Sequence, residues 1–400
     1  MWEISLIDIL CPTKINLIEG SFDDLPRIVK KYGIRILLLT GSKFLSSSNY
    51  LERLLHRFKR EEMEVFLFNG IKSNPTNYDV DEAVQFAKAN KCEVIVAIGG
   101  GSVIDSAKMV SIGCTSDHFC WDFFRDGDRP AKEIVSKSLP LVVMPTTSGT
   151  GSEVTPFAVI KNEDKKLKKG VKSRFLFPNE SIIDPKLLIH KSNELTLWTA
   201  CDAFGQSLES LTSAKANKFS NMLALESLRL NIMSLSQISK NPNSIMLREN
   251  LALSAMYSGL AITQTETNLC HALAESVGSL YDIHHGRLVG MLTTACVKNN
   301  IANVCEELRS SLIKKYQKVV SFMDDKNYRE YTDENTEDYL FYFFEDFFSK
   351  LGLDESLNSL NLVDLDKSKL AALALDMTSI KSNIVPVKKD HILEIFSQLT

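Results

Sequence analysis

The sequence predicts an α/β domain with a mostly parallel sheet and helices on both faces, followed by an all-α domain. Three observations support this fold class. Short apolar runs alternate with amphipathic segments over residues 14–144, which is typical of strand and helix units in a parallel sheet. Three glycines separate a buried strand from a helix near residue 100. From about residue 194 onward, nearly every segment has helical periodicity and strand-like runs are absent.

In the first half of the chain, five apolar runs predict strands and three amphipathic segments predict helices between them. We expect the strands at 14–19, 34–40, 64–69, 94–98 and 139–144, and the helices at 22–32, 51–62 and 78–89. The lysine-rich segment 161–172 predicts a solvated hairpin. Because the carboxyl ends of parallel strands form one edge of a sheet, a ligand is expected at that edge.

In the second half, long segments with apolar faces predict helices at 219–236, 247–259 and 339–351. The acidic run 323–338 predicts a solvated loop. After Asp184 and Pro185 the sequence pattern changes from alternating strands and helices to helices alone. We therefore divide the chain into an α/β domain at 1–187 and a helical domain at 188–400.

Composition favours a globular protein that acts on small molecules. The 400 residues are 44% hydrophobic and 24% charged, and the formal net charge is −4 with both signs well mixed. Such a balance gives no electrostatic reason to expect nucleic acid or a membrane surface as a partner. The N-terminal residues show no cationic leader, and no apolar run is long enough to span a bilayer, so we expect a cytoplasmic location. The eight cysteines are scattered, which favours reduced thiols.

The glycine turn is a candidate phosphate site. The strand VIVAI at 94–98 runs into Gly99, Gly100 and Gly101, and Ser102 is the expected N-cap of the helix that follows. Residues without side chains allow close backbone approach, and the first helical turn attracts an anion. The alternative is a tight turn between strand and helix that binds no ligand.

The helical half contains a candidate metal site. The chain has seven histidines, yet His271, His284 and His285 lie within fifteen residues, and Asp202 stands upstream. Imidazole nitrogens with a carboxylate oxygen suit zinc or ferrous iron. The alternative is a set of core histidines with ordinary hydrogen-bond partners.

Four motifs in order resemble the iron-containing (group III) alcohol dehydrogenase family. They are GGGSVIDSAK at 99–108, PTTSGTGSEVT at 145–155, DAFGQSLES at 202–210 and HALAESVGSLYDIHHG at 271–286. The resemblance covers nearly the whole chain. It implies an N-terminal dinucleotide-binding domain and a C-terminal helical domain, with metal, nicotinamide and substrate in the cleft between them.

The resemblance also implies a set of cofactor-binding residues. Two glycine- and hydroxyl-rich loops would face the phosphates, ribose and nicotinamide, and two further positions would lie near the ribose and the adenosine. These residues are Gly99, Gly100, Gly101, Ser102 and Asp105 in the first loop, Thr146, Thr147, Gly149, Thr150 and Ser152 in the second, and Lys168 and Asn74.

The segment after the strand at 34–40 bears on the choice of cofactor. NAD-dependent relatives tend to have an acidic residue there, which binds the ribose hydroxyls and repels a 2′-phosphate. This chain has Gly41, Ser42 and Lys43 instead. We therefore expect NADP(H) to be preferred over NAD(H), while a neutral loop that accepts both cofactors is the alternative.

The family's metal pattern matches this chain at three of four positions. The aspartate falls on Asp202, and the two later histidines fall on His271 and His285. Gln206 stands where the family usually has a histidine, so it is a candidate fourth ligand of one divalent iron or zinc ion, or else a hydrogen-bonding residue. Glu275 replaces a further histidine of many relatives. It follows His271 by one helical turn and is a candidate proton-transfer group.

The resemblance implies hydride transfer between a nicotinamide and a small aldehyde or alcohol, in a protein that forms a homodimer. The glutamine and the run PFAVI at 156–160 are also similar to the phosphonoacetaldehyde-reductase branch. In that case Arg174, Arg287 or nearby lysines would hold the anion. Two alternatives stay open. They are a cyclase similar to dehydroquinate synthase, which holds NAD and a metal ion, and a metal-free protein that only binds nucleotide.

Overall fold

The computed structural model describes residues 7, 9–41, 49–127, 129–135, 138–324, 336–360 and 365–400. Contacts between residues divide the chain into two compact units. We call 10–191 with 243–252 the α/β unit, and 192–242 with 253–400 the helical unit. The boundary predicted at residue 187 stays a prediction.

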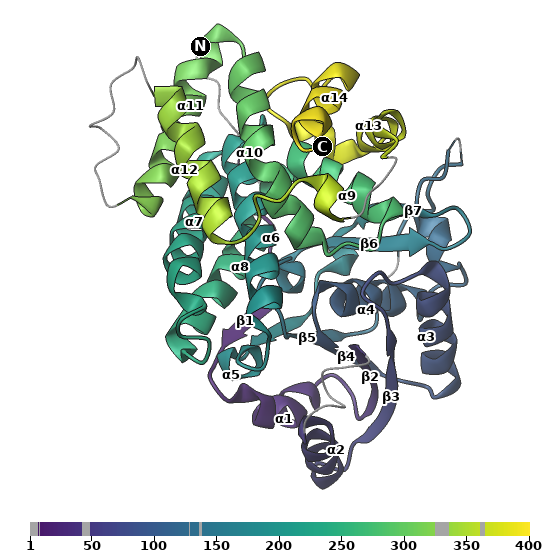
Figure 1. The fold of residues 1–400 in the computed structure, drawn as a ribbon. Helices are drawn as coiled ribbons and strands as arrows, with labels where there is room; N and C mark the ends of the chain where they lie inside the picture. The colour runs from purple at the N-terminus through teal and green to yellow at the C-terminus, as the bar shows by residue number, and fades with distance from the viewer. Residues whose placement is uncertain are drawn as a thin grey trace. The chain divides into compact units, whose positions relative to one another are not determined.

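The α/β unit contains a six-stranded parallel sheet (Figure 1). The strand order is β1-β8-β5-β4-β2-β3, and every pair of neighbours is parallel. The strands are β1 (Lys14–Leu17), β2 (Arg35–Gly41), β3 (Glu64–Ile71), β4 (Val94–Gly99), β5 (Leu141–Pro145) and β8 (Glu180–Ile183). All five predicted strands are present, and the structure adds β8 between β1 and β5.

The central strands are buried on both faces. Successive side chains of a strand point to opposite sides of the sheet, and each side packs into a separate core. Odd-numbered residues such as Leu37, Ile95 and Val143 pack against α3 (Asn77–Ala89) and α4 (Gly101–Gly113). Even-numbered residues such as Leu38 and Val96 belong to the opposite core. That core takes its helical side chains from α1 (Leu25–Val29), α2 (Tyr50–Arg60) and α5 (Pro185–Leu188). The predicted arrangement, a parallel sheet with helices on both faces, is thus confirmed.

The segment 22–32 differs from the single helix predicted for it. A 3₁₀ turn, η1 (Ser21–Asp24), precedes a short α1 that begins at Leu25. Pro26 stands in the first turn of α1, where its fixed φ and missing N–H favour a helix start. The lysine-rich segment forms the predicted hairpin, from β6 (Phe157–Asn162) and β7 (Leu167–Lys172). The remaining short 3₁₀ segments of this unit are η2 (Cys120–Phe123), η3 (Ser152–Val154) and η4 (Arg174–Leu176).

After Ile183 the described residues contain helices and no strand. The long helices are α6 (Asn193–Thr212), α7 (Lys218–Ile238), α8 (Ile245–Thr265), α9 (Leu269–Leu280), α10 (His285–Asn303), α11 (Glu306–Met323) and α12 (Thr336–Lys350). The chain ends with η7 (Leu357–Leu360), α13 (Lys367–Leu375), η8 (Thr378–Ser382) and α14 (Lys389–Gln398). Most of the predicted acidic loop, 325–335, lies outside the described residues.

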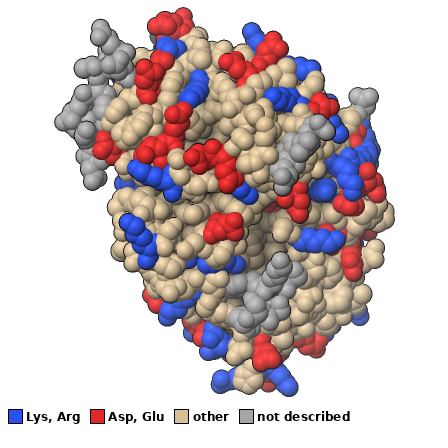
Figure 2. Space-filling model, in the orientation of Figure 1, with Lys and Arg blue, Asp and Glu red and all other residues tan. Residues whose placement is uncertain are grey.

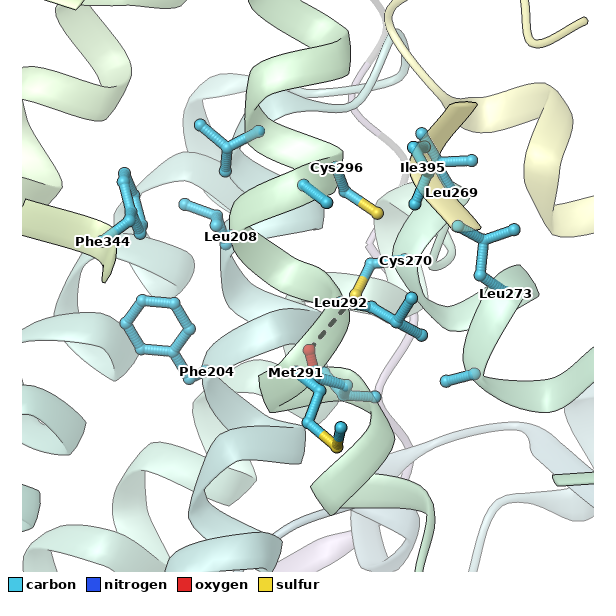
Figure 3. Packing of buried hydrophobic residues seen from close by; sticks show 14 of the residues in the cluster. Phe204, Leu208, Leu269, Cys270, Leu273, Met291, Leu292, Cys296, Phe344 and Ile395 are labelled. Atoms are coloured by element: carbon cyan, nitrogen blue, oxygen red, sulfur yellow. Dashed lines mark hydrogen bonds between the residues drawn. The ribbon is translucent and has the colours of Figure 1, made fainter. Parts of the chain in front are cut away.

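The core of the helical unit surrounds α6, α9 and α10. Figure 3 shows part of this core, including Phe204 of α6, Leu273 of α9, Leu292 of α10 and Phe344 of α12. The rings of Phe204 and Phe344 meet edge to face, with centroids 6.4 Å apart. This packing fixes the three helices that carry the candidate metal ligands.

Charges of both signs are interspersed over the surface in Figure 2, as the sequence composition predicts. In the part of the chain that the structure describes, no helix combines the length and apolarity needed to cross a bilayer.

Candidate metal centre and nucleotide loops

The helical unit brings three predicted metal ligands together. Asp202 is on α6, His271 is on α9 and His285 is the first residue of α10. One ligand atom from each residue lies within 4.8 Å of the others. His271 and His285 follow Asp202 by 69 and 83 positions in the chain, yet all three side chains meet in the fold.

The distances suit a bound cation. Asp202 Oδ1 is 3.2 Å from Nε2 of His271 and 3.7 Å from Nε2 of His285. Two ligands of a tetrahedral zinc ion, each about 2.1 Å from the metal, are about 3.4 Å apart. A carboxylate oxygen and the lone pair of a neutral imidazole repel each other unless a proton or a metal ion lies between them. The donor set and its spacing thus fit a divalent metal.

Two glycines allow the helices to approach this closely. A Cβ atom on Gly286 would lie 2.0 Å from the carbonyl oxygen of Trp198 on α6. A Cβ atom on Gly205 would lie 2.3 Å from Val289 Cγ1 on α10. Because neither atom is present, the first turn of α10 packs directly on α6 and places His285 beside Asp202.

Burial and charge act in opposite directions at this centre. Asp202 and His271 are buried, at 4% and 3% exposed, whereas the side chain of His285 is 26% exposed. Burial by itself would raise the pKa of Asp202, but its hydrogen bond with His271 and the charge of His285 hold that pKa below its ordinary value. Burial opposes a charged His271, yet the carboxylates of Glu209 and Asp202 hold its pKa well above the ordinary value. The partial exposure of His285 leaves one side of the centre accessible.

Gln206 lies one turn after Asp202 on α6 and is buried. Its Nε2 donates to Asp202 Oδ1 at 3.4 Å, and its Oε1 accepts from the Ser258 hydroxyl at 2.9 Å. The amide oxygen, which is the atom able to bind a metal, thus contacts α8. Glu275 lies on α9 one turn after His271 and is partly exposed. His284 is the N-cap of α10, and its ring centroid lies 5.2 Å from that of Trp198.

Sequence reasoning missed Glu209, whose Oε2 lies 2.6 Å from Nδ1 of His271. The available signal was its spacing. Glu209 follows Asp202 by seven residues in a predicted helix, so two turns place both carboxylates on the same face.

In the α/β unit, the glycine turn occupies the carboxyl end of β4. The N-cap of α4 is Gly100, so the prediction of Ser102 as N-cap is wrong. The helix begins two residues earlier because a glycine cap allows closer packing, and the Ser102 hydroxyl donates to the carbonyl oxygen of Ser73 instead. Gly100 offers no side-chain acceptor, and the first turn contains no acidic residue. The first N–H groups of α4 thus retain the character of an anion site.

The two predicted cofactor loops pack against each other. The N–H of Thr146 donates to the carbonyl oxygen of Gly99 at 2.9 Å. A Cβ atom on Gly100 would lie 3.1 Å from Thr147 Oγ1, and one on Gly101 would lie 2.5 Å from Thr150 Cγ2. The absence of side chains at these glycines therefore allows the two loops to pack together, and it would also allow a ligand to approach the backbone.

A buried polar cluster holds the second loop to α4. Asp105 accepts from the Ser152 hydroxyl at 2.5 Å and from the N–H of Val159 at 2.9 Å. Lys108 is buried and donates to Ser152 Oγ at 2.8 Å and to Thr155 Oγ1 at 3.1 Å. The side chains of Asp105 and Ser152, predicted to bind cofactor, contact one another here.

Three further predicted cofactor residues, Gly41, Asn74 and Lys168, are among the described residues. Gly41 ends β2, and a Cβ atom on it would lie 3.6 Å from Val103 Cγ2 of α4. Asn74 lies in the loop that Ser102 binds through Ser73, and Lys168 lies on β7 opposite Lys161. Ser42 and Lys43 lie outside the described residues.

Comparison with known proteins gives matches along the whole chain. Two family profiles match, "Iron-containing alcohol dehydrogenase" at residues 12–185 and "Fe-containing alcohol dehydrogenase family, C-terminal" at residues 196–400. The 1,3-propanediol dehydrogenase of Citrobacter freundii is 26% identical over 383 residues, which cover 93% of this chain and 95% of that protein.

Solved structures of alcohol dehydrogenases and of a related reductase have a similar fold. The archaeal halo-thermophilic alcohol dehydrogenase ADH/D1 from a Red Sea brine pool aligns with a TM-score of 0.90 and 27% identity, over 99% of each chain. The sulfoacetaldehyde reductase of Bifidobacterium kashiwanohense, solved in complex with NAD+, aligns with a TM-score of 0.83 and 25% identity, over 98% of each chain.

Proposed function

The chain belongs to the iron-containing alcohol dehydrogenase family, and from this premise we propose that Asp202, His271 and His285 hold the divalent metal of a nicotinamide-linked reduction of a small aldehyde. The observation that carries the proposal is the meeting of two imidazole Nε2 atoms at one buried carboxylate oxygen. A metal ion bound there would take the place of a proton between the ring nitrogens and the carboxylate.

A divalent metal held by Asp202, His271 and His285 would supply Lewis-acid chemistry at the substrate carbonyl. Asp202 supplies negative charge from a buried position, and His271 is fixed between Asp202 and Glu209. His285 lies on the accessible side, where a substrate oxygen would approach. Glu275, partly exposed on the same helix as His271, is our candidate for exchange of the alcohol proton.

Gln206 has a supporting role in this proposal. Its amide oxygen accepts from Ser258 while its nitrogen faces Asp202, which supports a three-ligand centre completed by water or substrate. An amide oxygen that ligated the metal would have to leave Ser258 by rotation of the side chain.

The glycine turn and the second loop would bind the dinucleotide in this proposal. The first turn of α4 would bind the pyrophosphate through backbone N–H groups, and Gly99, Gly100 and Gly101 allow its approach. Asp105 and Ser152 are proposed to keep the second loop against α4, with Thr147 and Thr150 facing the cofactor. Asn74 and Lys168 are proposed to lie along the adenosine and ribose.

We propose a preference for NADPH over NADH. β2 ends at Gly41, and Ser42 and Lys43 follow it in the sequence. None of these residues has a carboxylate that would repel a 2′-phosphate, and the lysine would attract it. The sulfoacetaldehyde reductase in the comparison was solved with NAD+. A ratio of kcat/KM for NADPH and NADH above one supports the preference, and a ratio below one overturns it.

The proposed substrate is a short aldehyde. Phosphonoacetaldehyde is the specialised candidate, because the run PFAVI follows the second loop in this sequence. Arg287 is bound by Glu355 at 2.5 Å and its guanidinium lies over the Trp198 ring, whereas Arg174 is exposed. An anionic substrate held by Arg287 would have to displace Glu355. The homodimer implied by the resemblance stays a prediction.

The test is cofactor oxidation, followed by near-ultraviolet absorbance, with short neutral aldehydes and with phosphonoacetaldehyde. Chelator-treated protein is assayed without metal and after addition of ferrous iron or zinc. We expect turnover only with metal, and its loss in His271→Ala and His285→Ala. His118→Ala, which changes an exposed histidine of the α/β unit, is the matched control and keeps full activity. Nucleotide binding without reduction by any metal form would instead favour the cyclase or the nucleotide-binding protein.

A further inference from the structure

A third carboxylate, Glu209, lies behind the metal ligands and has no part in the proposed reaction. It is on α6, two turns after Asp202, and is only 6% exposed. A buried carboxylate is costly unless each of its oxygens has hydrogen-bond partners. Its contacts are therefore informative about what it does.

Glu209 is fully occupied by one short segment of α9. Its Oε1 accepts from the N–H groups of Cys270 at 2.6 Å and His271 at 3.2 Å, and its Oε2 accepts from the N–H of Asn268 at 3.0 Å. The fourth contact is the 2.6 Å approach of Oε2 to Nδ1 of the His271 ring. The same carboxylate thus binds the beginning of α9 and the imidazole that projects from it.

The contact with the ring determines its tautomer. An ionised carboxylate can only accept, so Nδ1 of His271 must donate. In a neutral imidazole the lone pair then lies on Nε2, which is the atom that faces Asp202 at 3.2 Å. A metal can bind His271 only through that lone pair.

We propose that Glu209 is the positioning residue that holds Nε2 of His271 toward Asp202 and thereby sets the affinity of the centre for its metal. This inference rests on the proposed function. Glu209 does not contact the metal in this scheme. It acts through the orientation and tautomer of the His271 ring, and it ties that ring to the backbone of α9.

The test uses the full chain with Glu209→Gln, which keeps the side chain's size. A glutamine keeps one acceptor for the backbone N–H groups, but its other atom is an amide nitrogen, which donates toward Nδ1. That donor favours the tautomer with hydrogen on Nε2, where it obstructs the metal. Glu209→Ala is less suitable, because Glu209 lines a small cavity of about 20 Å³ with Thr212, Asn300 and Tyr316, and truncation would enlarge it.

The matched control is Asn268→Ala. Asn268 is the N-cap of α9. Its side chain accepts from the N–H of Leu269 at 2.8 Å and donates to the backbone carbonyl oxygen of Glu209 at 3.1 Å, but among the described contacts it has no hydrogen bond with the Glu209 carboxylate or the His271 ring. Both variants weaken the N-terminus of α9, but only Glu209→Gln changes the partner of the ring. A purely structural role of Glu209 would thus give the same result in both.

The measurement is Co²⁺ affinity of chelator-treated protein, by competition with a chromophoric chelator, together with the ligand-field spectrum of the loaded protein. For Glu209→Gln we expect about 10- to 100-fold weaker binding and a changed spectrum. Asn268→Ala is expected to keep the wild-type affinity and spectrum while unfolding at a lower temperature. NADPH binding is expected to be unchanged in both.

Wild-type Co²⁺ affinity and spectrum in Glu209→Gln, with only a lower unfolding temperature, would show that Glu209 is a helix cap and overturn the inference. Equal losses of affinity in both variants would also overturn it. If the wild-type chain binds no Co²⁺, the proposed metal centre itself fails, and the inference fails with it. These results separate a failure of the positioning role from a failure of the proposed function.

Discussion

Gln206 is the residue at which this chain departs from its family's metal pattern, and the structure shows how α6 accommodates it. Its amide bridges Asp202 and Ser258, two residues on different helices. The bridge keeps Asp202 in place without a fourth protein ligand. The departure therefore predicts a weaker but intact metal centre.

Gln206→His is expected to tighten metal binding, because it adds an imidazole on the same helix face as Asp202. We expect a gain of about 1.4 kcal/mol or more, which is a tenfold lower dissociation constant. Isothermal titration with Zn²⁺ measures it. Ser258→Ala is the control, because it removes the partner of the amide without adding a ligand, and it is expected to leave affinity nearly unchanged. An unchanged affinity in Gln206→His would place residue 206 out of reach of the metal.

Glu153 gives a second residue-scale prediction. Burial raises its pKa to about 7, although the charge of Lys108 acts in the opposite direction. Burial also lowers the pKa of Lys108 to about 8. Glu153 thus lies within the second loop and Lys108 lies against it, and both have pKa values near neutrality.

Because the folded pKa of Glu153 lies above its unfolded value of 4.5, the protein loses stability as the pH rises from 4.5 to about 7. Glu153→Gln removes this loss, so its stability relative to wild type should rise by up to about 3 kcal/mol over that window. Urea denaturation at a series of pH values measures the difference. Glu82→Gln, on an exposed position of α3, is the control. A difference that stays constant with pH would show that Glu153 ionises normally.

At the scale of the element, glycines decide how closely helices meet at both sites. The metal centre depends on the first turn of α10, where Gly286 packs against the α6 backbone. The same principle operates at Gly99, Gly100 and Gly101, whose absent side chains leave room for Val103, Thr147 and Thr150. Helix propensity disfavours glycine inside a helix, so packing is the reason for Gly286 in α10.

Gly286→Ala is expected to destabilise the protein by about 1–3 kcal/mol, because its Cβ would lie 2.0 Å from a backbone oxygen and α10 must move. The displacement of His285 should also weaken metal binding. Gly278→Ala is the matched control in α9, where the nearest atom to the new Cβ is Leu288 Cδ1 at 3.9 Å. There the better helix former should add roughly 0.5–1 kcal/mol. Chemical denaturation compares the two, and equal effects would refute the close-packing explanation.

At the scale of the whole molecule, the two candidate sites belong to different units with different cores. The proposed metal ligands lie in the helical unit, whose core surrounds α6, α9 and α10. The glycine turn lies in the α/β unit, between the sheet and α4. A ligand stabilises the segments that it binds, which gives each site a separate signature.

Hydrogen exchange is expected to separate the two ligands. Addition of Zn²⁺ to chelator-treated protein should slow exchange in α6, α9 and the first turn of α10. Addition of NADPH should slow exchange in the first turn of α4 and over residues 145–155. Mass spectrometry of peptic fragments locates the protection. Zn²⁺ protection that is centred on α4, or that persists in His285→Ala, would contradict the assignment of the metal site.

The sequence by itself determined the order of the elements and the chemistry of the candidate sites. Short, nearly continuous apolar runs predicted five of the six strands, because the side chains of a strand inside a parallel sheet are buried on both faces. The strand β8 was missed, since its four residues ESII begin with a glutamate that Lys31 and Tyr32 hold in the fold. Four ordered motifs also indicated the family, because each combines residue types with a spacing.

Only the tertiary structure decided which side chains meet. His271 and His285 reach Asp202 across 69 and 83 residues, and no local rule predicts their distances to its oxygen. The contacts of Gln206 with Ser258 and of Glu209 with His271 depend on how α6 packs against α8 and α9. The local sequence fixes periodicity and turn chemistry, whereas contacts between distant residues depend on packing in three dimensions. For that reason the candidate metal ligands could be identified from the sequence. Glu209, which we propose positions His271, was found only in the fold.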